Sequence, residues 1–245
     1  MSKPIDAHMH FNHKADDPVS DLLMQISSCN LSGCVLILNT DIDKMLYHRN
    51  QQAINDNYTT IWVSYLLDIM KNDIQQDEWI GASYIKIHPR LSRITTSDFC
   101  AYADALKSIP AQVVTIDCFT YGHELSHHVS MEMTIFLAER FPRVKFIIAH
   151  GGGVDLLKCI LITKTLPNIY YDLSLTCNYL WDSSVRLDMV QMVKFHANRV
   201  LFGSDYPDFT PTQAIERINN LCDMADLAIH DRQLILRENA LLLYG

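Results

Sequence analysis

The sequence predicts an α/β protein folded as a single (β/α)8 TIM barrel. Eight short apolar runs alternate with longer segments of helical periodicity along the 245 residues. No Gly/Ser/Pro-rich linker interrupts this alternation, which favours one domain over residues 1–245. Polar residues fall at or just past the ends of several runs, where a barrel carries its chemistry. A doubly wound open sheet is the alternative architecture, and the many polar strand ends favour the barrel.

The expected strands are short apolar runs that a parallel sheet would bury on both faces. In chain order they are Pro4–His8, Cys34–Leu38, Thr60–Leu66, Ser83–His88, Gln112–Asp117, Lys145–His150, Ile169–Asp172 and Val200–Phe202. The expected helices have apolar residues at intervals of three and four. They are Val19–Cys29, Lys44–Asn55, Ile74–Trp79, Ser97–Lys107, Met131–Arg140, Val154–Thr165, Ser184–His196, Pro211–Met224 and Arg232–Leu243.

Composition narrows the range of functions. Hydrophobic residues make up 49% and charged residues 20%, which excludes a disordered chain or a coiled coil. The formal net charge is −8 and basic residues form no long run, so nucleic acid and anionic membranes are poor candidate partners. Charged and histidine residues interrupt the N-terminus before a signal peptide could form, and no apolar stretch is long enough to span a membrane. We therefore expect a cytoplasmic protein with reduced cysteines.

The first expected strand ends in the motif D-A-H-M-H, which contains His8 and His10. Side chains two residues apart on a strand point to the same face, with Cα atoms about 6.6 Å apart. In an arbitrary sequence such a pair is more often two hydrogen-bonded core histidines. At the end of the first strand of a barrel, however, the two rings are placed to bind one divalent ion.

Two further strands deliver polar side chains into turns. His150 precedes three glycines, whose missing side chains allow a ligand or backbone to approach closely. A phosphate loop is not favoured there, because the spacing and lysine of such loops are missing. Asp205 lies in a Gly-Ser-Asp turn, where it is either a turn former or a carboxylate that binds a metal and accepts a proton. Asp172 is expected to be structural or to face the substrate.

Taken in order, these segments resemble the amidohydrolase superfamily. Within it they resemble the amidohydrolase-related branch, which includes aminocarboxymuconate semialdehyde decarboxylase and similar hydrolases and decarboxylases. The resemblance covers nearly the whole chain. It is carried by D-A-H-M-H, Y-I-K-I-H-P, F-I-I-A-H-G-G-G, Y-Y-D-L-S, L-F-G-S-D-Y-P and R-E-N-A-L-L-L-Y-G.

The resemblance implies a barrel with a divalent metal, usually zinc, held by the H-x-H pair, a histidine ending strand five and an aspartate ending strand eight. His8, His10 and Asp205 match these ligands by position. Asp205 would be both metal ligand and general base. His150 matches the strand-six histidine that, in mononuclear members, helps to activate water or polarise the substrate.

The fifth strand departs from the family pattern, because it ends in Asp117 where the family usually has a histidine. Asp117 is the natural counterpart as a ligand, and two histidines with two aspartates make a harder site that also suits manganese or iron. Alternatively, His123, His127 or His128 folds back to supply the missing nitrogen. The sequence leaves both alternatives open.

The K-I-H-P-R segment supplies candidate substrate-binding residues. In the branch that it resembles, the lysine is usually unmodified, rather than carbamylated and bridging two metals. Lys86 and His88 share one face of the expected strand, and Arg90 follows. Together they would form a cationic rim suited to a carboxylate-bearing substrate. The alternative is that Lys86 and Arg90 form ion pairs with nearby acids.

The function expected from these residues is that of a metal-dependent hydrolase acting on a small carboxylate-bearing or cyclic substrate through metal-activated water. Asp205 would take the proton, and His150 would stabilise the developing oxyanion. The alternatives are a non-oxidative decarboxylase or a metal-independent lactonase on the same barrel, and, from another class, a non-catalytic ligand-binding barrel. The loops leave little room for a lid, so closure by a neighbouring subunit of a homodimer is a further hypothesis. The loops do not indicate which small molecule is the substrate.

Overall fold

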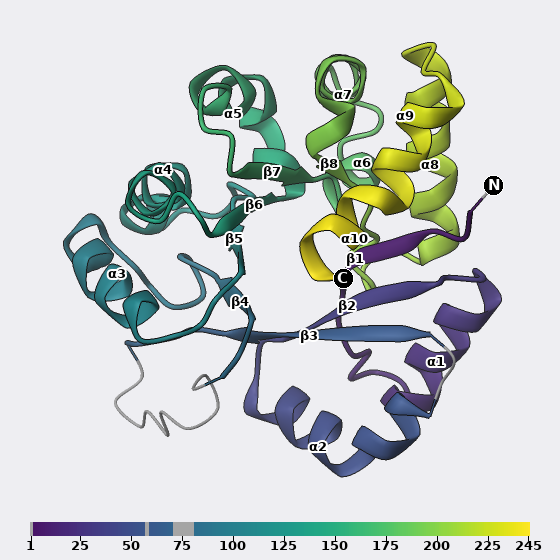
Figure 1. Cartoon of the computed structure of the whole chain (residues 1–245), viewed down its shortest axis with the longest axis horizontal. Helices are drawn as coiled ribbons and strands as arrows, with labels where there is room; N and C mark the ends of the chain where they lie inside the picture. The colour runs from purple at the N-terminus through teal and green to yellow at the C-terminus, as the bar shows by residue number, and fades with distance from the viewer. Residues whose placement is uncertain (1, 57–58, 71–80) are drawn as a thin grey trace. The chain divides into compact units, whose positions relative to one another are not determined.

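The computed structural model describes residues 2–56, 59–70 and 81–245. Eight strands form one sheet whose order follows the chain, from β1 to β8 (Figure 1). The first strand also pairs with the last segment: Met9 forms a parallel bridge with Tyr206, and the Ala7 N–H donates to the Phe202 carbonyl at 2.9 Å. This strand order and closure are those of a (β/α)8 barrel. The predicted fold class is therefore confirmed.

The strands agree closely with the expected runs. They are β1 (Ile5–Met9), β2 (Gly33–Leu38), β3 (Thr60–Leu66), β4 (Tyr84–Ile87), β5 (Val113–Asp117), β6 (Lys145–Ala149), β7 (Ile169–Asp172) and β8 (Val200–Leu201). Every residue of β1, β2 and β5 is buried, as expected for parallel strands that are covered on both faces. Polar residues placed at strand ends by the sequence, such as His88 and His150, lie just past the ends of β4 and β6.

Within the described residues, a helix follows every strand except β3. The helices are α1 (Pro18–Ser28), α2 (Asp41–Asn55), α3 (Phe99–Lys107), α4 (Ser130–Arg140), α5 (Leu156–Thr163), α6 (Thr176–Tyr179), α7 (Val185–His196), α8 (Pro211–Met224), α9 (Ile229–Gln233) and α10 (Asn239–Tyr244). Side-chain caps begin several of them: the Thr40 and Asp43 side chains form a capping box at α2. The expected helix Ile74–Trp79 lies outside the described residues.

The C-terminal helix differs from its prediction. In place of one helix over Arg232–Leu243, α9 and α10 are joined by a π-helical turn at Leu234–Glu238. The carbonyl of Ile235 in this turn accepts a hydrogen bond of 3.0 Å from the Phe202 N–H, just past β8. The Asn239 side chain donates two bonds of 2.7 Å to backbone carbonyls at and just before the start of β8. Bonds to the strand therefore reshape the helix, and the local sequence carries no sign of them.

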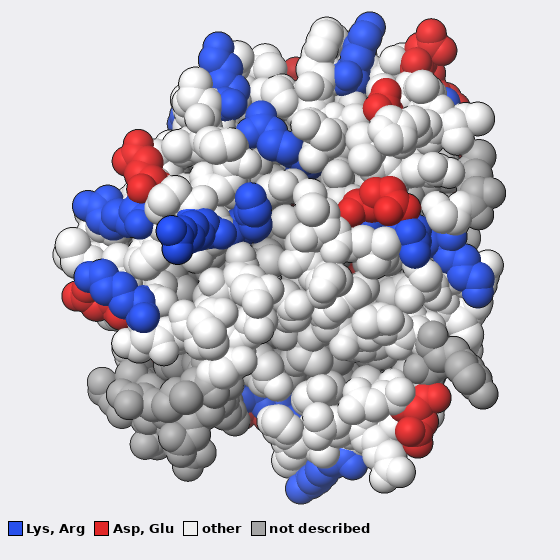
Figure 2. Space-filling view, viewed as in Figure 1, with Lys and Arg blue, Asp and Glu red and all other residues white. Residues whose placement is uncertain are grey.

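The chain divides into two compact units, which are described separately. The first unit comprises Met1–Val63 and Asp172–Gly245, and the second comprises Ser64–Tyr171. Each has its own apolar core, with Leu36 and Leu201 fully buried in the first and Ile85 and Phe146 fully buried in the second. Acidic and basic side chains are interspersed on the face shown in Figure 2. Within the described residues, no helix is long and apolar enough to cross a membrane.

Candidate metal centre and the second histidine–carboxylate cluster

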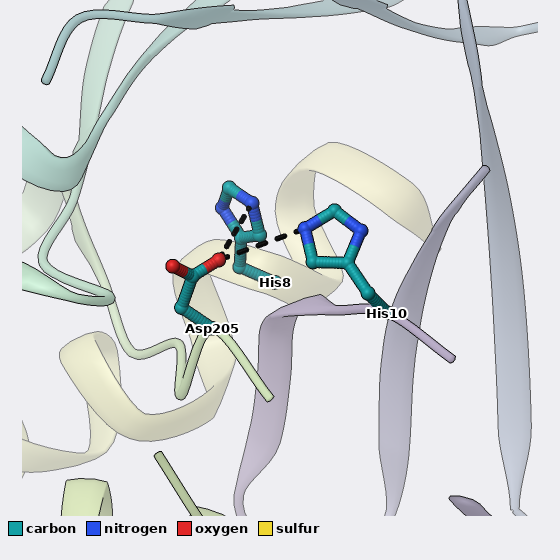
Figure 3. Close-up of side chains that lie close together, drawn as sticks. All are labelled: His8, His10 and Asp205. Carbon is teal, nitrogen blue, oxygen red and sulfur yellow. Dashed lines mark ion pairs between the residues drawn. The ribbon is translucent and has the colours of Figure 1, made fainter. Parts of the chain in front are cut away.

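The predicted ligands His8, His10 and Asp205 come together in the first unit (Figure 3). His8 Nε2 lies 3.3 Å from Asp205 Oδ1, and His10 Nε2 lies 3.6 Å from the same oxygen. His8 is almost fully buried, at 1% exposure. The sequence predicted the convergence of the two rings, and the structure adds that both face one carboxylate oxygen.

The backbone around Asp205 is held tightly to β1. Asp205 has a φ of 61°, a left-handed conformation that is uncommon for a residue with a side chain, and its N–H donates to the His8 carbonyl at 2.9 Å. Gly203 approaches the ligand segment closely, because a Cβ there would lie 2.8 Å from Asp172 Oδ1 and 3.0 Å from His8 Cβ. The turn therefore needs a glycine, and it fixes where the Asp205 carboxylate points.

The Nδ1 atoms of both rings, which lie on the side away from Asp205, are hydrogen-bonded to acceptors. His8 Nδ1 lies 2.5 Å from Asp172 Oδ2, and His10 Nδ1 lies 3.1 Å from the Ile37 carbonyl oxygen. A carbonyl or carboxylate only accepts, so both Nδ1 atoms carry the proton. A neutral ring then directs the lone pair of its Nε2 at Asp205, and three acceptors face one another. Such an arrangement is stable when a cation lies among them.

The spacing of these donor atoms suits a divalent ion. Zinc bonds of about 2.0–2.2 Å in tetrahedral geometry place neighbouring donors about 3.3 Å apart, close to the separations of 3.3 and 3.6 Å seen here. The carboxylate beside His8 Nδ1 is a common outer partner of a metal-binding histidine, because it fixes the tautomer and the ring orientation. The residues present therefore fit a divalent metal.

Two residues that support the ligands were not singled out as site residues from the sequence. Asp6 Oδ1 accepts from the His8 N–H at 3.1 Å and from the Ser204 N–H at 3.0 Å, which ties β1 to the turn before Asp205. Burial raises the pKa of Asp6 to about 7. Ser174 Oγ donates to Asp172 Oδ2 at 2.9 Å and so orients the partner of His8. The D-A-H-M-H motif contains Asp6 but gives no sign of these contacts.

A second cluster, in the second unit, surrounds Asp117. Asp117 Oδ2 lies 3.1 Å from His150 Nε2 and 3.6 Å from both Lys86 Nζ and His88 Nε2. Lys86 is completely buried. The sequence allowed either a cationic rim for substrate or ion pairs with acids, and the structure pairs Lys86 with Asp117. Substrate binding by Lys86 and metal binding by Asp117 stay predictions.

The charges in this cluster shift its titrations. Burial raises the pKa of Asp117, but the neighbouring His88, Lys86 and His150 outweigh it and hold that pKa well below its usual range. Burial, with the charges of Lys86 and Arg90, lowers the pKa of His88 to about 4. His88 is therefore neutral near pH 7, with Nδ1 accepting from the Leu91 N–H at 3.3 Å. Asp117 and Lys86 form the charged pair.

The glycines after His150 permit a close approach by side chains of the same chain. His150 itself has a φ of 58°. A Cβ at Gly152 would lie 2.3 Å from Cys159 Sγ, and one at Gly153 would lie 2.9 Å from the Phe119 ring. Larger residues would displace this turn and the His150 ring with it.

Arg90 and the loop histidines line two pockets near this cluster. The Arg90 guanidinium carbon lies 3.4 Å from the centre of the Tyr121 ring. An open pocket of about 450 Å³ is lined by His88, Arg90, Tyr121 and His123 among others. A smaller cavity of about 70 Å³ is lined by Arg90, Asp117, His127 and His128 among others. Replacement of the usual strand-five ligand by a loop histidine stays a prediction.

A (β/α)8 barrel with two histidines of the first strand facing an aspartate after the last strand is the architecture of a metal-dependent hydrolase. Residues 84–245 match the family model described as amidohydrolase. The match runs over most of the chain, so the protein belongs to the amidohydrolase family and is an amidohydrolase-like enzyme. His8 and His10 lie N-terminal to the matched residues.

Solved structures agree with the fold. An uncharacterized TIM-barrel protein from Bordetella bronchiseptica is similar with a TM-score of 0.74 at 16% identity, over 99% of this chain and 98% of that chain. A TatD family hydrolase from Entamoeba histolytica is similar with a TM-score of 0.69 at 9% identity, over 100% and 99%. A phosphotriesterase from Mycobacterium tuberculosis is similar with a TM-score of 0.50 at 11% identity, over 99% and 93%. No curated protein matches the chain.

Proposed function

We propose that the protein hydrolyses a small carboxylate-bearing or cyclic substrate with the help of a divalent metal. The observation that carries this proposal is the convergence of His8 Nε2, His10 Nε2 and Asp205 Oδ1, with both Nδ1 atoms bonded to acceptors. Membership of the amidohydrolase family supports the reaction class. Family membership does not indicate the substrate, so the carboxylate or ring of the substrate is our own proposal.

The proposed metal ligands are His8, His10 and Asp205. Asp117, the fourth ligand that the sequence predicts, is paired with Lys86. Zinc suits the nitrogen-rich set, and manganese or iron would gain from additional carboxylate oxygen. When bound, such an ion supplies polarisation of the substrate and a lowered pKa for a water molecule. The side chains supply the proton transfers and the orientation.

Asp205 is the proposed general base. Its side chain is only 10% exposed, and the tightly held turn fixes its direction, so it is prepositioned to accept a proton. Asp172 keeps His8 in one tautomer and is a positioning residue.

His150 is proposed to stabilise negative charge that develops on the substrate. Asp117, 3.1 Å from its Nε2, favours a positive charge on that imidazole. A cationic imidazole held in a buried site stabilises an oxyanion more effectively than it would in water. Arg90 and the neutral His88 line the open pocket and are the proposed contacts for the substrate, while Lys86 is engaged with Asp117.

The proposal is tested by screening carboxylate-bearing lactones, cyclic amides and open-chain amides with protein loaded with zinc, manganese or iron. We expect hydrolysis that a chelator abolishes and that added metal restores. The His150→Ala variant should keep its metal and lose turnover, whereas His230→Gln, an exposed control, should keep both. Release of carbon dioxide would instead identify a decarboxylase. Turnover that survives complete chelation would contradict the proposal in favour of a metal-independent lactonase.

A further inference from the structure

The small cavity in the second unit lies where the chain leaves β5 and where α4 and α5 begin. Its volume is about 70 Å³. Each ordered water occupies roughly 10–15 Å³ on this measure, so the cavity has room for about five waters or one small polar group. Asp117 lines it, which places the cavity beside the carboxylate that holds His150.

Two buried nitrogen atoms among the residues that line this cavity lack hydrogen-bond partners. They are Arg90 Nε and His128 Nε2, and no atom of the described residues bonds to either of them. An unmet buried donor or acceptor costs about 1–3 kcal/mol, so both need a ligand or water. The Tyr121 ring, 3.4 Å from the guanidinium carbon, holds the Arg90 side chain in place. Arg90 also lines the larger open pocket, so its side chain borders both.

The N-terminus of α4 adds further donors. Ser130, Met131 and Glu132 form its first turn and line the cavity. The residue before them, Val129, has no side-chain acceptor and caps no N–H group. First-turn N–H groups and a guanidinium together favour an anionic acceptor.

The charge of the lining limits which anion fits. Glu132, Asp155 and Asp117 are acidic and line the same cavity as the cationic Arg90 and Lys158, and Asp117 is paired with Lys86. A dianion such as phosphate would be repelled by these carboxylates more strongly than a monoanion, whereas one carboxylate carries a single charge and matches the forked guanidinium. The cavity therefore suits a monoanionic carboxylate.

We propose that this cavity binds a carboxylate group of the substrate, with Arg90 and His128 as the side chains that recognise it. This inference rests on the proposed function. It adds the place where the substrate carboxylate is bound, and it adds His128 to Arg90 as a residue that recognises this group. His128 is a specificity residue under this proposal.

The test is an NMR titration of the full-length protein with propionate, propionamide and inorganic phosphate. Propionate should bind, and both Arg90→Lys and His128→Gln should weaken it at least about tenfold. Arg140→Lys is the matched control, because Arg140 also lies over an aromatic ring, 3.5 Å from the centre of Phe136, on α4. This variant and His230→Gln should bind propionate as the unmodified protein does, and propionamide and phosphate should bind more weakly than propionate.

The inference is overturned if propionate does not bind, if both variants bind it normally, or if phosphate binds more tightly. The His8→Ala variant separates the two proposals. Propionate binding retained in His8→Ala supports the cavity whatever the outcome of the hydrolase screen, and binding lost in His8→Ala assigns the carboxylate to the metal ligands and overturns the inference. Failure of the screen with propionate binding intact would count against the proposed function alone.

Discussion

The two histidine–carboxylate clusters use the same residue types for different chemistry. Asp117 is surrounded by nitrogens that include the ammonium of Lys86, so a side chain of the protein balances its charge. Asp205 faces two imidazoles whose protons point the other way, toward Asp172 and the Ile37 carbonyl. The arrangement around Asp117 is an ion pair with neighbouring histidines, and the arrangement around Asp205 is the proposed set of metal ligands. The direction of the protons, more than the identity of the residues, distinguishes the two.

The largest expected effect comes from breaking the ion pair. Lys86→Met leaves Asp117 as a buried charge without its ammonium, which should lower the free energy of unfolding by about 3–5 kcal/mol. Lys86→Met combined with Asp117→Asn should be more stable than the single variant. Urea denaturation measures both. A cost below about 1 kcal/mol for Lys86→Met would show that the pair is not a buried ion pair.

The pKa of His88, lowered by burial to about 4, predicts a pH dependence of stability. Between pH 4 and 6.5 the unfolded chain binds a proton on this ring and the folded protein does not, so stability rises with pH. Across this window the free energy of unfolding changes by at most about 3.4 kcal/mol because of His88. His88→Gln should remove this part of the slope, as measured by urea denaturation across the window. Asp6, whose pKa is raised to about 7, gives the opposite slope in both proteins and cancels in the difference. An unchanged slope would mean that His88 titrates normally.

Removing the partner of His8 should have a smaller effect. Asp172→Asn keeps the shape of the side chain but weakens the hold on the His8 tautomer, and metal affinity should fall about 10- to 100-fold. Competition with a coloured chelator measures this affinity. Asp182→Asn, at an exposed site, is the control and should bind metal normally. Equal metal affinities in the two variants would show that Asp172 does not position His8 for metal binding.

The smallest expected effect is on metal binding by Asp117→Asn. If Lys86 balances the charge of Asp117, the affinity for zinc should stay within about twofold, whereas loss of a true ligand or of an outer partner costs about tenfold or more. The same chelator competition measures it. A tenfold loss would make Asp117 the fourth ligand, as the sequence predicts, and Asp117→His should then tighten zinc binding.

The strands were predictable because a parallel strand buried on both faces is a short apolar run. The bounds of β3 and β7 agree with the expected runs, and the other strands differ by one residue at one or both ends. The helical segment at the C-terminus was predicted, but its π-helical turn was not, because the bond from the Phe202 N–H to the Ile235 carbonyl depends on a segment far away in the sequence.

The convergence of His8, His10 and Asp205 was predictable for a similar reason: the two histidines lie at and just past the end of β1, Asp205 follows β8, and the ends of parallel strands meet. The partner of His8 was not, because Asp172 lies 164 residues away and a lone Asp at a strand end has many roles. Local sequence likewise gave no sign that Arg90 and His128 would line one cavity.

The most direct test of the central claim is elemental analysis of the purified, unchelated protein and of its His8→Ala variant. We predict close to one zinc, manganese or iron ion per chain in the unmodified protein and almost none in His8→Ala, with His150→Ala retaining its metal. An unmodified protein that takes up no metal even from excess zinc and manganese would contradict the account, and so would a His8→Ala variant that binds metal normally.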